Sequence, residues 1–118
     1  MSDRLVTPAS QEPTLFGQVI LIVQRRWVLA KSLSSAFEAK GARVLLANTA
    51  DSGVASADHP DLAAAVLDGQ SLQLCRKLGK RSIPFVVYTG LEHVDDATTI
   101  VRKPESAEQV VASVLRLL

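Results

Sequence analysis

The chain has 118 residues and a mass of 12.7 kDa, enough for one domain with its own apolar core and too short for two. Its net charge of +1 and its 47% hydrophobic content predict no general attraction to nucleic acid or to anionic membranes. Cys75 is the only cysteine, which excludes an intrachain disulfide and favours a reducing compartment. Because no apolar run is long enough to span a membrane, we expect a soluble, cytoplasmic protein.

The first 17 residues are predicted to form a flexible N-terminal arm, and residues 18–118 the folded domain. The arm is polar, contains Pro8 and Pro13, and shows no apolar periodicity. It also lacks the basic and apolar regions of a signal peptide.

Two strands and a helix are expected next. Gln18–Val23 is predicted to be a buried strand, because its last five residues are apolar and mostly β-branched. Trp27–Lys40 carries apolar residues at the spacing of one helix face, and Gly41 is placed to end this helix with a left-handed residue. Ala42–Ala47 follows as a second apolar strand.

The most informative stretch is Leu62–Gly69, with six apolar residues followed by Asp68 and a glycine. Such a run indicates a strand covered on both faces, although a short buried helix has the same pattern. Before it, Thr49–Ala57 is predicted to be a short helix capped by Asn48 or Thr49. Asp68 would then lie at the carboxyl end of a central strand, where open parallel sheets usually place their chemistry.

The second half continues the alternation of helix and strand. The expected elements are a helix at Gln70–Lys80, a strand at Ile83–Tyr88, a single turn at most at Leu91–Ala97, a strand at Thr98–Arg102 and a helix at Ser106–Leu118. Five strands alternating with helices predict a parallel sheet with helices on both faces.

Polar residues follow several of these strands and should meet at one edge of the sheet. They are Gln24, Arg25, Arg26, Asp68, Thr89 and Lys103. An aspartate, a hydroxyl and a lysine at one site suit acyl phosphate chemistry, in which the carboxylate attacks phosphorus and the other groups contact the phosphoryl oxygens. For Asp68 alone, a helix N-cap is the simpler interpretation.

Four local patterns resemble the receiver domain of two-component response regulators. They are Ile20-Leu-Ile-Val23, then Pro60-Asp61 leading into Val66-Leu67-Asp68, then Tyr88-Thr89-Gly90, and finally Arg102-Lys103-Pro104. The resemblance covers about Val19 to Leu118 and implies a flavodoxin-like (βα)5 fold, a doubly wound parallel five-stranded sheet. It further implies a non-enzymatic signalling protein whose phosphoacceptor is Asp68, with Thr89 and Lys103 contacting the phosphoryl group.

The chain departs from the family pattern at the metal site. Receivers carry two acidic residues after the first strand that help to bind magnesium, whereas this chain has Gln24 and Arg25. Asp68 and the backbone carbonyl of Gln70 would be the remaining ligands, so magnesium binding should be weak or absent. Arg25 could reach Asp68 and act as a built-in cation, or it could point into solvent; we therefore treat Gln24 and Arg25 as candidate regulatory residues.

The chain also departs from the family in length. Only 13 residues separate Thr89 from Lys103, which predicts a shortened or missing fourth helix. Ile100 stands where receivers usually have an aromatic residue, so a relay from Thr89 to an aromatic switch is not expected.

These patterns favour a stand-alone receiver protein that accepts a phosphoryl group from a sensor histidine kinase or a histidine phosphotransfer protein, and that could form a homodimer. The alternative is a pseudo-receiver, an interaction module that works without phosphorylation. A flavodoxin-like enzyme or nucleotide binder is less favoured, since no glycine-rich phosphate loop follows the first strand. His59 and His93 are expected at the surface, and we expect no metal site at Asp95-Asp96.

Overall fold

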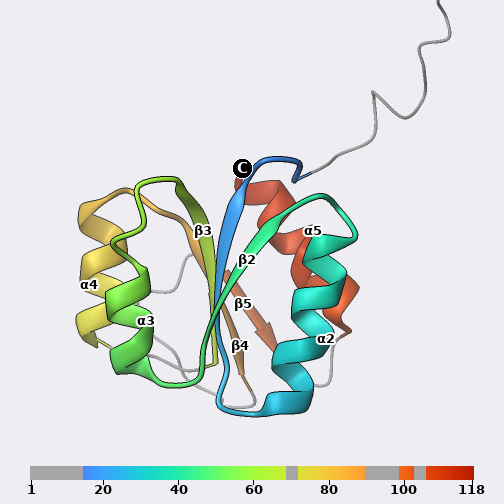
Figure 1. Ribbon diagram of the computed structural model, residues 1–118, viewed down its shortest axis with the longest axis horizontal. Helices are drawn as coiled ribbons and strands as arrows, with labels where there is room; N and C mark the ends of the chain where they lie inside the picture. The colour runs from blue at the N-terminus through green and yellow to red at the C-terminus, as the bar shows by residue number, and fades with distance from the viewer. Residues whose placement is uncertain (1–14, 69–71, 90–98, 103–105) are drawn as a thin grey trace, which may run out of the picture.

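The computed structural model describes residues 15–68, 72–89, 99–102 and 106–118. Its centre is a parallel sheet with the strand order β2-β1-β3-β4-β5. The strands are β1 (Val19–Val23), β2 (Arg43–Ala47), β3 (Leu62–Leu67), β4 (Phe85–Thr89) and β5 (Thr99–Arg102). The described helices, labelled as in Figure 1, are α2 (Trp27–Glu38), α3 (Ala50–Ser56), α4 (Leu72–Lys80) and α5 (Ala107–Leu117).

The helices form two layers, one on each face of the sheet. Helices α2 and α5 pack together on one face, and α3 and α4 cover the other (Figure 1). This is the α/β architecture that the alternating pattern predicted, a parallel sheet with helices on both faces. The predicted shortened fourth helix would fall within residues 90–98, which lie outside the described part of the chain.

The apolar run before Asp68 forms strand β3, as predicted, and not a buried helix. Its alternate residues face two separate cores: Ala64 and Val66 pack under α2 and α5, whereas Ala65 and Leu67 pack under α3 and α4. Because both faces are covered, both sets of positions must be apolar, which explains the unbroken run.

Local signals set most of the helix ends. Gly41, beyond the end of α2, has the left-handed φ of 92° expected of it. Thr49, not Asn48, caps α3, since its side chain accepts a hydrogen bond from the N–H of Ser52. Ser106 caps α5 by accepting from the N–H of Gln109 at 3.3 Å.

Several details differ from the sequence-based expectation. Leu15, assigned to the arm, is fully buried, and its N–H donates to Lys40 O at 2.8 Å. Strand β4 begins at Phe85, because Pro84 has no N–H for the ladder, although its carbonyl still accepts from Ala65. The last helix was predicted to run to Leu118, but α5 ends at Leu117, and Leu118 is 52% exposed.

None of the described helices is both long enough and apolar enough to cross a lipid bilayer.

Candidate functional site

The carboxyl ends of β1 and β3 place Asp68 beside Arg25. Val23, the last residue of β1, is in register with Leu67, the last residue of β3. The residues that follow these two strands therefore leave the sheet side by side. Two segments more than forty positions apart in sequence meet at this point.

Arg25 makes two contacts with one oxygen of Asp68. Its backbone N–H donates to Oδ2 at 2.9 Å, and its Nε donates to the same oxygen at 3.4 Å. No described residue donates to Oδ1 of Asp68. The carboxylate is thus held at one oxygen while the other has no partner in the described part of the chain.

The backbone contact is the stronger constraint on Asp68. The Arg25 side chain is 79% exposed, whereas that of Asp68 is 17% exposed. An exposed ion pair with a 3.4 Å separation is worth little, because water and salt screen it and the arginine loses rotamer freedom. The main-chain N–H, in contrast, would be present with any non-proline residue at position 25. Asp68 is therefore positioned mainly by the backbone of Arg25.

Gln24 is buried, although the sequence-based resemblance led us to expect it at a metal-ligand position. Its N–H donates to Ala47 O at 3.0 Å and so extends the pairing of β1 with β2. The residue is 2% exposed, and neither atom of its side-chain amide has a hydrogen-bond partner in the described part of the chain. An unsatisfied buried amide is costly. The burial of Gln24 was not predicted, because its position after an apolar strand suggested an edge residue.

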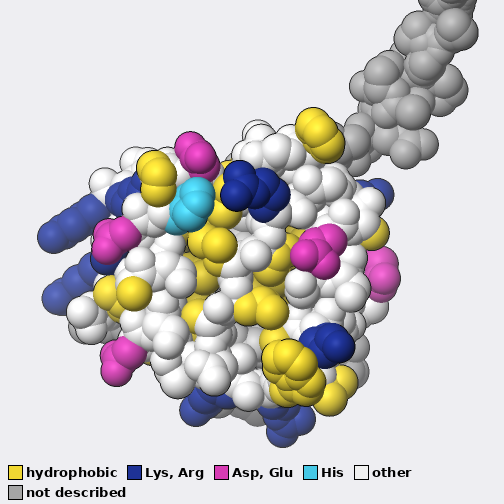
Figure 2. Space-filling view, in the orientation of Figure 1, with side chains coloured by type: hydrophobic (Ala, Val, Ile, Leu, Met, Phe, Trp, Pro, Cys, Tyr) yellow, Lys and Arg dark blue, Asp and Glu magenta, His cyan; other side chains and the backbone are white. Residues whose placement is uncertain are grey.

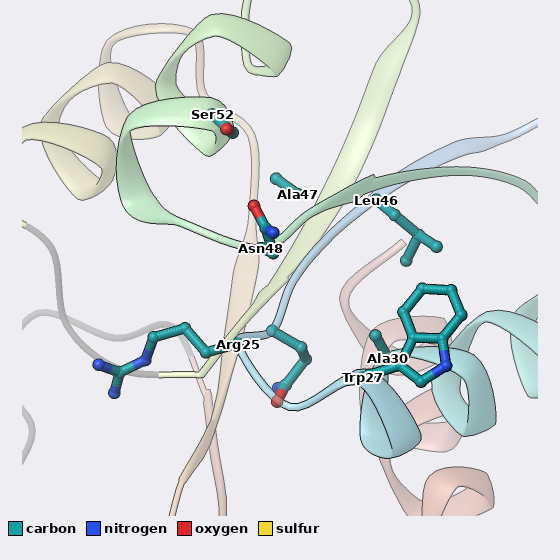
Figure 3. Close-up of a pocket in the computed structure, with 8 residues that line it drawn as sticks. Arg25, Trp27, Ala30, Leu46, Ala47, Asn48 and Ser52 are labelled. Carbon is teal, nitrogen blue, oxygen red and sulfur yellow. The ribbon is translucent and has the colours of Figure 1, made fainter.

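A pocket of about 380 Å³ lies between the carboxyl ends of β1 and β2 and the first turns of α2 and α3. Its lining consists of Gln24, Arg25, Trp27, Ala30, Leu46, Ala47, Asn48 and Ser52. Figure 3 shows the Trp27 ring beside Leu46 and Ala30, with the Arg25 side chain directed away from them. Sequence reasoning missed this pocket, because its walls come from residues that were interpreted only as parts of helices and strands.

The other predicted site residues are described only in part. Thr89 is the last residue of β4 and is in register with Arg102, so it lies at the same edge of the sheet as Asp68; its side chain lies outside the described residues. Lys103 and Gln70 lie wholly outside them, as do His93 and Asp95-Asp96. The alternative role of Asp68 as a helix cap involves residues 69–71, which are likewise outside.

A divalent cation does not fit the groups that the structure describes at this edge. Among the described residues, no three His, Cys, Asp or Glu side chains come together. The side chain of Arg25 has no acceptor atom, and Oε1 of Gln24 is buried and inaccessible in its present position. Among the described residues Asp68 would be the only charged ligand, whereas magnesium prefers several oxygens in octahedral geometry.

Comparison with known proteins identifies the fold. Neither a protein-family model nor a curated protein matches the sequence. Solved structures of receiver domains do match. A receiver domain protein from Methanospirillum hungatei JF-1 superimposes with a TM-score of 0.74 and 19% identity, covering 85% of this chain and 92% of that one. A Francisella response regulator receiver domain matches with a TM-score of 0.73 and 16% identity, covering 86% and 96%.

A third match is a response regulator from Burkholderia pseudomallei, whose structure contains a phosphorylated aspartic acid, a calcium ion and citrate. Its TM-score is 0.69 and its identity 19%, and the match covers 82% of this chain and 66% of that one. The predicted resemblance is confirmed at the level of structure: this chain has the receiver-domain fold, with a sequence far from those of the matched proteins.

Proposed function

We propose that this protein is a receiver domain in two-component signalling that accepts a phosphoryl group on Asp68 with little or no dependence on magnesium. The observation that carries the proposal is the asymmetry at Asp68. Oδ2 is held by the N–H of Arg25 at 2.9 Å, whereas Oδ1 has no partner among the described residues. A carboxylate held in a fixed orientation is the arrangement that a nucleophile needs.

The reaction balances without a metal. Oδ1 attacks the phosphorus of a donor such as acetyl phosphate, an O–P bond forms, and the bond between phosphorus and acetate breaks as acetate leaves with its electron pair. Arg25, being 79% exposed, can turn its guanidinium toward the phosphoryl oxygens and contribute charge-assisted hydrogen bonds. Thr89 and Lys103 are proposed as the further contacts of the phosphoryl group.

In this role the protein acts as a signalling module and not as an enzyme. Its phosphoryl donor would be a sensor histidine kinase or a histidine phosphotransfer protein, and phosphorylation would alter a surface that a partner recognises. A cytoplasmic location agrees with the single, buried Cys75.

The second candidate is a pseudo-receiver that works without phosphorylation. The Nε contact of Arg25 with Asp68 favours it, because this contact keeps a cation where the acidic pair of receivers would hold a metal. High exposure of the Arg25 side chain weighs against a locked site.

Labelling with acetyl phosphate, followed by intact mass spectrometry, separates the two candidates. Wild-type protein should gain one hydroxylamine-sensitive phosphoryl group with and without magnesium, and Asp68→Asn should gain none. If wild-type protein gains no phosphoryl group under any condition, the receiver function is rejected and the pseudo-receiver is supported.

Substitution Arg25→Asp tests whether Arg25 replaces the metal. It should make labelling faster in magnesium and slower without it, because a second carboxylate provides a ligand and removes a cation. The matched control is Arg26→Asp, which makes the same charge change at the N-cap of α2 and should leave the metal dependence of labelling unchanged. Equal labelling of wild-type protein and Arg25→Asp, with and without magnesium, would show that Arg25 has no such role.

A further inference from the structure

Strand β2 has an open hydrogen-bonding edge. The N–H of Arg43 donates to Gln18 O at 2.9 Å, and Ala47 O accepts from the N–H of Gln24 at 3.0 Å. Because backbone groups alternate sides along a strand, the N–H and C=O of Val44 and Leu46 point away from β1. Strand β2 is the last strand of the sheet on that side. Two residues therefore present four backbone groups that no described strand pairs.

In the part of the chain that the structure describes, this edge lacks the features that usually protect edge strands. In natural proteins a lysine, a proline, a bulge or a covering segment usually prevents an edge strand from pairing with another chain. The register of β2 with β1 is unbroken from Arg43 to Ala47, and Arg43 is the only charged residue of the strand. The middle of β2 is apolar, and Leu46 is 46% exposed.

Exposed apolar side chains lie next to the open edge. Trp27 is 68% exposed and Leu46 46% exposed, and the Trp27 ring lies beside Leu46 (Figure 3). Figure 2 shows hydrophobic side chains gathered between the two helix layers on the face where β2 lies in front. Exposed apolar surface of this kind, beside unpaired backbone groups, is typical of a protein interface.

We propose that β2 is the dimer interface of this protein, where it pairs antiparallel with β2 of a second copy about a two-fold axis through Leu45. In this register Val44 lies opposite Leu46 of the partner subunit, and Leu46 lies opposite Val44 of the partner subunit. Opposed residues of this type exchange both their N–H···O bonds. Two such pairs give four hydrogen bonds, which satisfy all four open groups of each copy.

The side chains are also compatible with this register. Val44 and Leu46 project toward the α2 face, where Val44 already packs against the core, so apolar residues face each other across the axis. Arg43 lies opposite Ala47 of the partner subunit, and no like charges are opposed. The two sheets join into one, and Trp27 of each copy flanks the junction. The N–H and C=O groups of Val44 and Leu46 are thus complementary to the same groups of a second copy, and we infer that a second copy binds at this edge. The inference does not depend on phosphorylation of Asp68.

The first test is the mass of the full chain in solution, measured by light scattering or sedimentation over a range of concentrations. Wild-type protein should have twice the monomer mass of 12.7 kDa. Leu46→Lys should be monomeric, because it places a charge on the apolar edge. The control Leu118→Lys changes another exposed leucine, 52% exposed at the end of α5, and should remain dimeric.

Two results would overturn the proposal. One is a monomeric wild-type protein; if a form lacking residues 1–14 then dimerises, those residues occupy the edge instead of a second copy. The other is a Leu46→Lys variant that folds, as judged by circular dichroism, and remains dimeric, which would place the interface elsewhere.

Cysteine cross-linking tests the register independently of Leu46→Lys. Residues on the axis form a non-hydrogen-bonded pair with Cα atoms about 4.5 Å apart, within the range of a disulfide. With oxidised glutathione, Leu45→Cys should give a covalent dimer on a non-reducing gel that dithiothreitol reverses. Leu46→Cys should cross-link far less, since residue 46 faces residue 44. Wild-type protein has only the buried Cys75 and serves as the blank. Equal cross-linking of the two variants would reject the two-fold axis through Leu45.

Discussion

Gln24 and Arg25 are neighbours in sequence but lie in opposite environments. Gln24 is 2% exposed, whereas the side chain of Arg25 is 79% exposed and extends toward Asp68. Gln24 still pairs with Ala47 of β2, whereas Arg25 lies in a bend between β1 and α2. The two residues therefore have separate consequences, one for stability and one for the contacts of Asp68.

At Gln24 we predict that an apolar residue of similar size increases stability. Gln24→Met removes a buried amide whose two polar atoms have no described partner, so the free energy of unfolding should rise by about 1–2 kcal/mol. Urea denaturation followed by circular dichroism measures this change. The matched variant Gln24→Glu should be destabilised, because it buries a charge. A Gln24→Met variant less stable than wild type would show that the amide is satisfied in solution.

At the scale of elements, two glycines in different helices have different roles. A Cβ atom on Gly53 of α3 would lie 2.9 Å from Cγ2 of Val23 and 3.1 Å from Cδ2 of Leu74. On Gly79 of α4, a Cβ atom would meet nothing within 4 Å. Gly53 therefore allows α3 to approach the sheet and α4, whereas Gly79 only weakens the helix in which it lies.

The same substitution at these two glycines should have opposite effects. Gly79→Ala should stabilise the protein by about 0.5–1 kcal/mol, since alanine is the better helix former. Gly53→Ala should destabilise it by about 1–3 kcal/mol, because the methyl group overpacks the core beneath α3. Thermal or urea unfolding of the two variants provides the comparison. A stabilising Gly53→Ala would mean that α3 can shift outward at no cost.

At the scale of the whole molecule, Arg81 and Lys77 connect parts of the chain that are distant in sequence. Nη1 of Arg81, just after α4, donates to the carbonyls of Ala57 and His59, and Nη2 donates to that of Pro60. Lys77 donates to Val54 O at 2.9 Å and forms an ion pair with Asp58 at 2.8 Å. The end of α4 is thus attached to the end of α3 and to the turn before β3.

Loss of the hydrogen bonds from the Arg81 guanidinium should therefore reduce global stability. Arg81→Met keeps an aliphatic side chain but leaves three backbone carbonyls without this donor. The free energy of unfolding should fall by about 1–2 kcal/mol. Arg76→Met, on the exposed side of α4, is the control and should change stability by less than about 0.5 kcal/mol. Chemical denaturation of both variants tests this, and equal stability would contradict the role of Arg81.

The fold followed from patterns that depend on neighbouring residues. Apolar runs such as Leu62–Leu67 identified the strands, and Ser106 marked the start of α5 because its side chain caps a helix within three residues. Their alternation identified the parallel sheet, since βαβ units with helices on both faces leave few other arrangements.

The site was predictable only as a set of positions. Because parallel strands end at one edge, the sequence placed Arg25 and Asp68 near each other. It left open whether Arg25 would reach Asp68 or point into solvent, since a long flexible side chain has both conformations available. The structure shows a mostly exposed side chain that nevertheless contacts Oδ2, and a backbone N–H that makes the shorter bond.

Sequence alone was sufficient for the class of fold, the central strand and the position of Asp68, because periodicity and capping depend on residues a few positions apart. Tertiary structure decided the burial of Gln24, the pocket beside Trp27, the contact of Arg25 with Asp68 and the open edge at Val44 and Leu46. Each of these depends on which segments pack side by side, and packing is set by contacts between residues far apart in the chain.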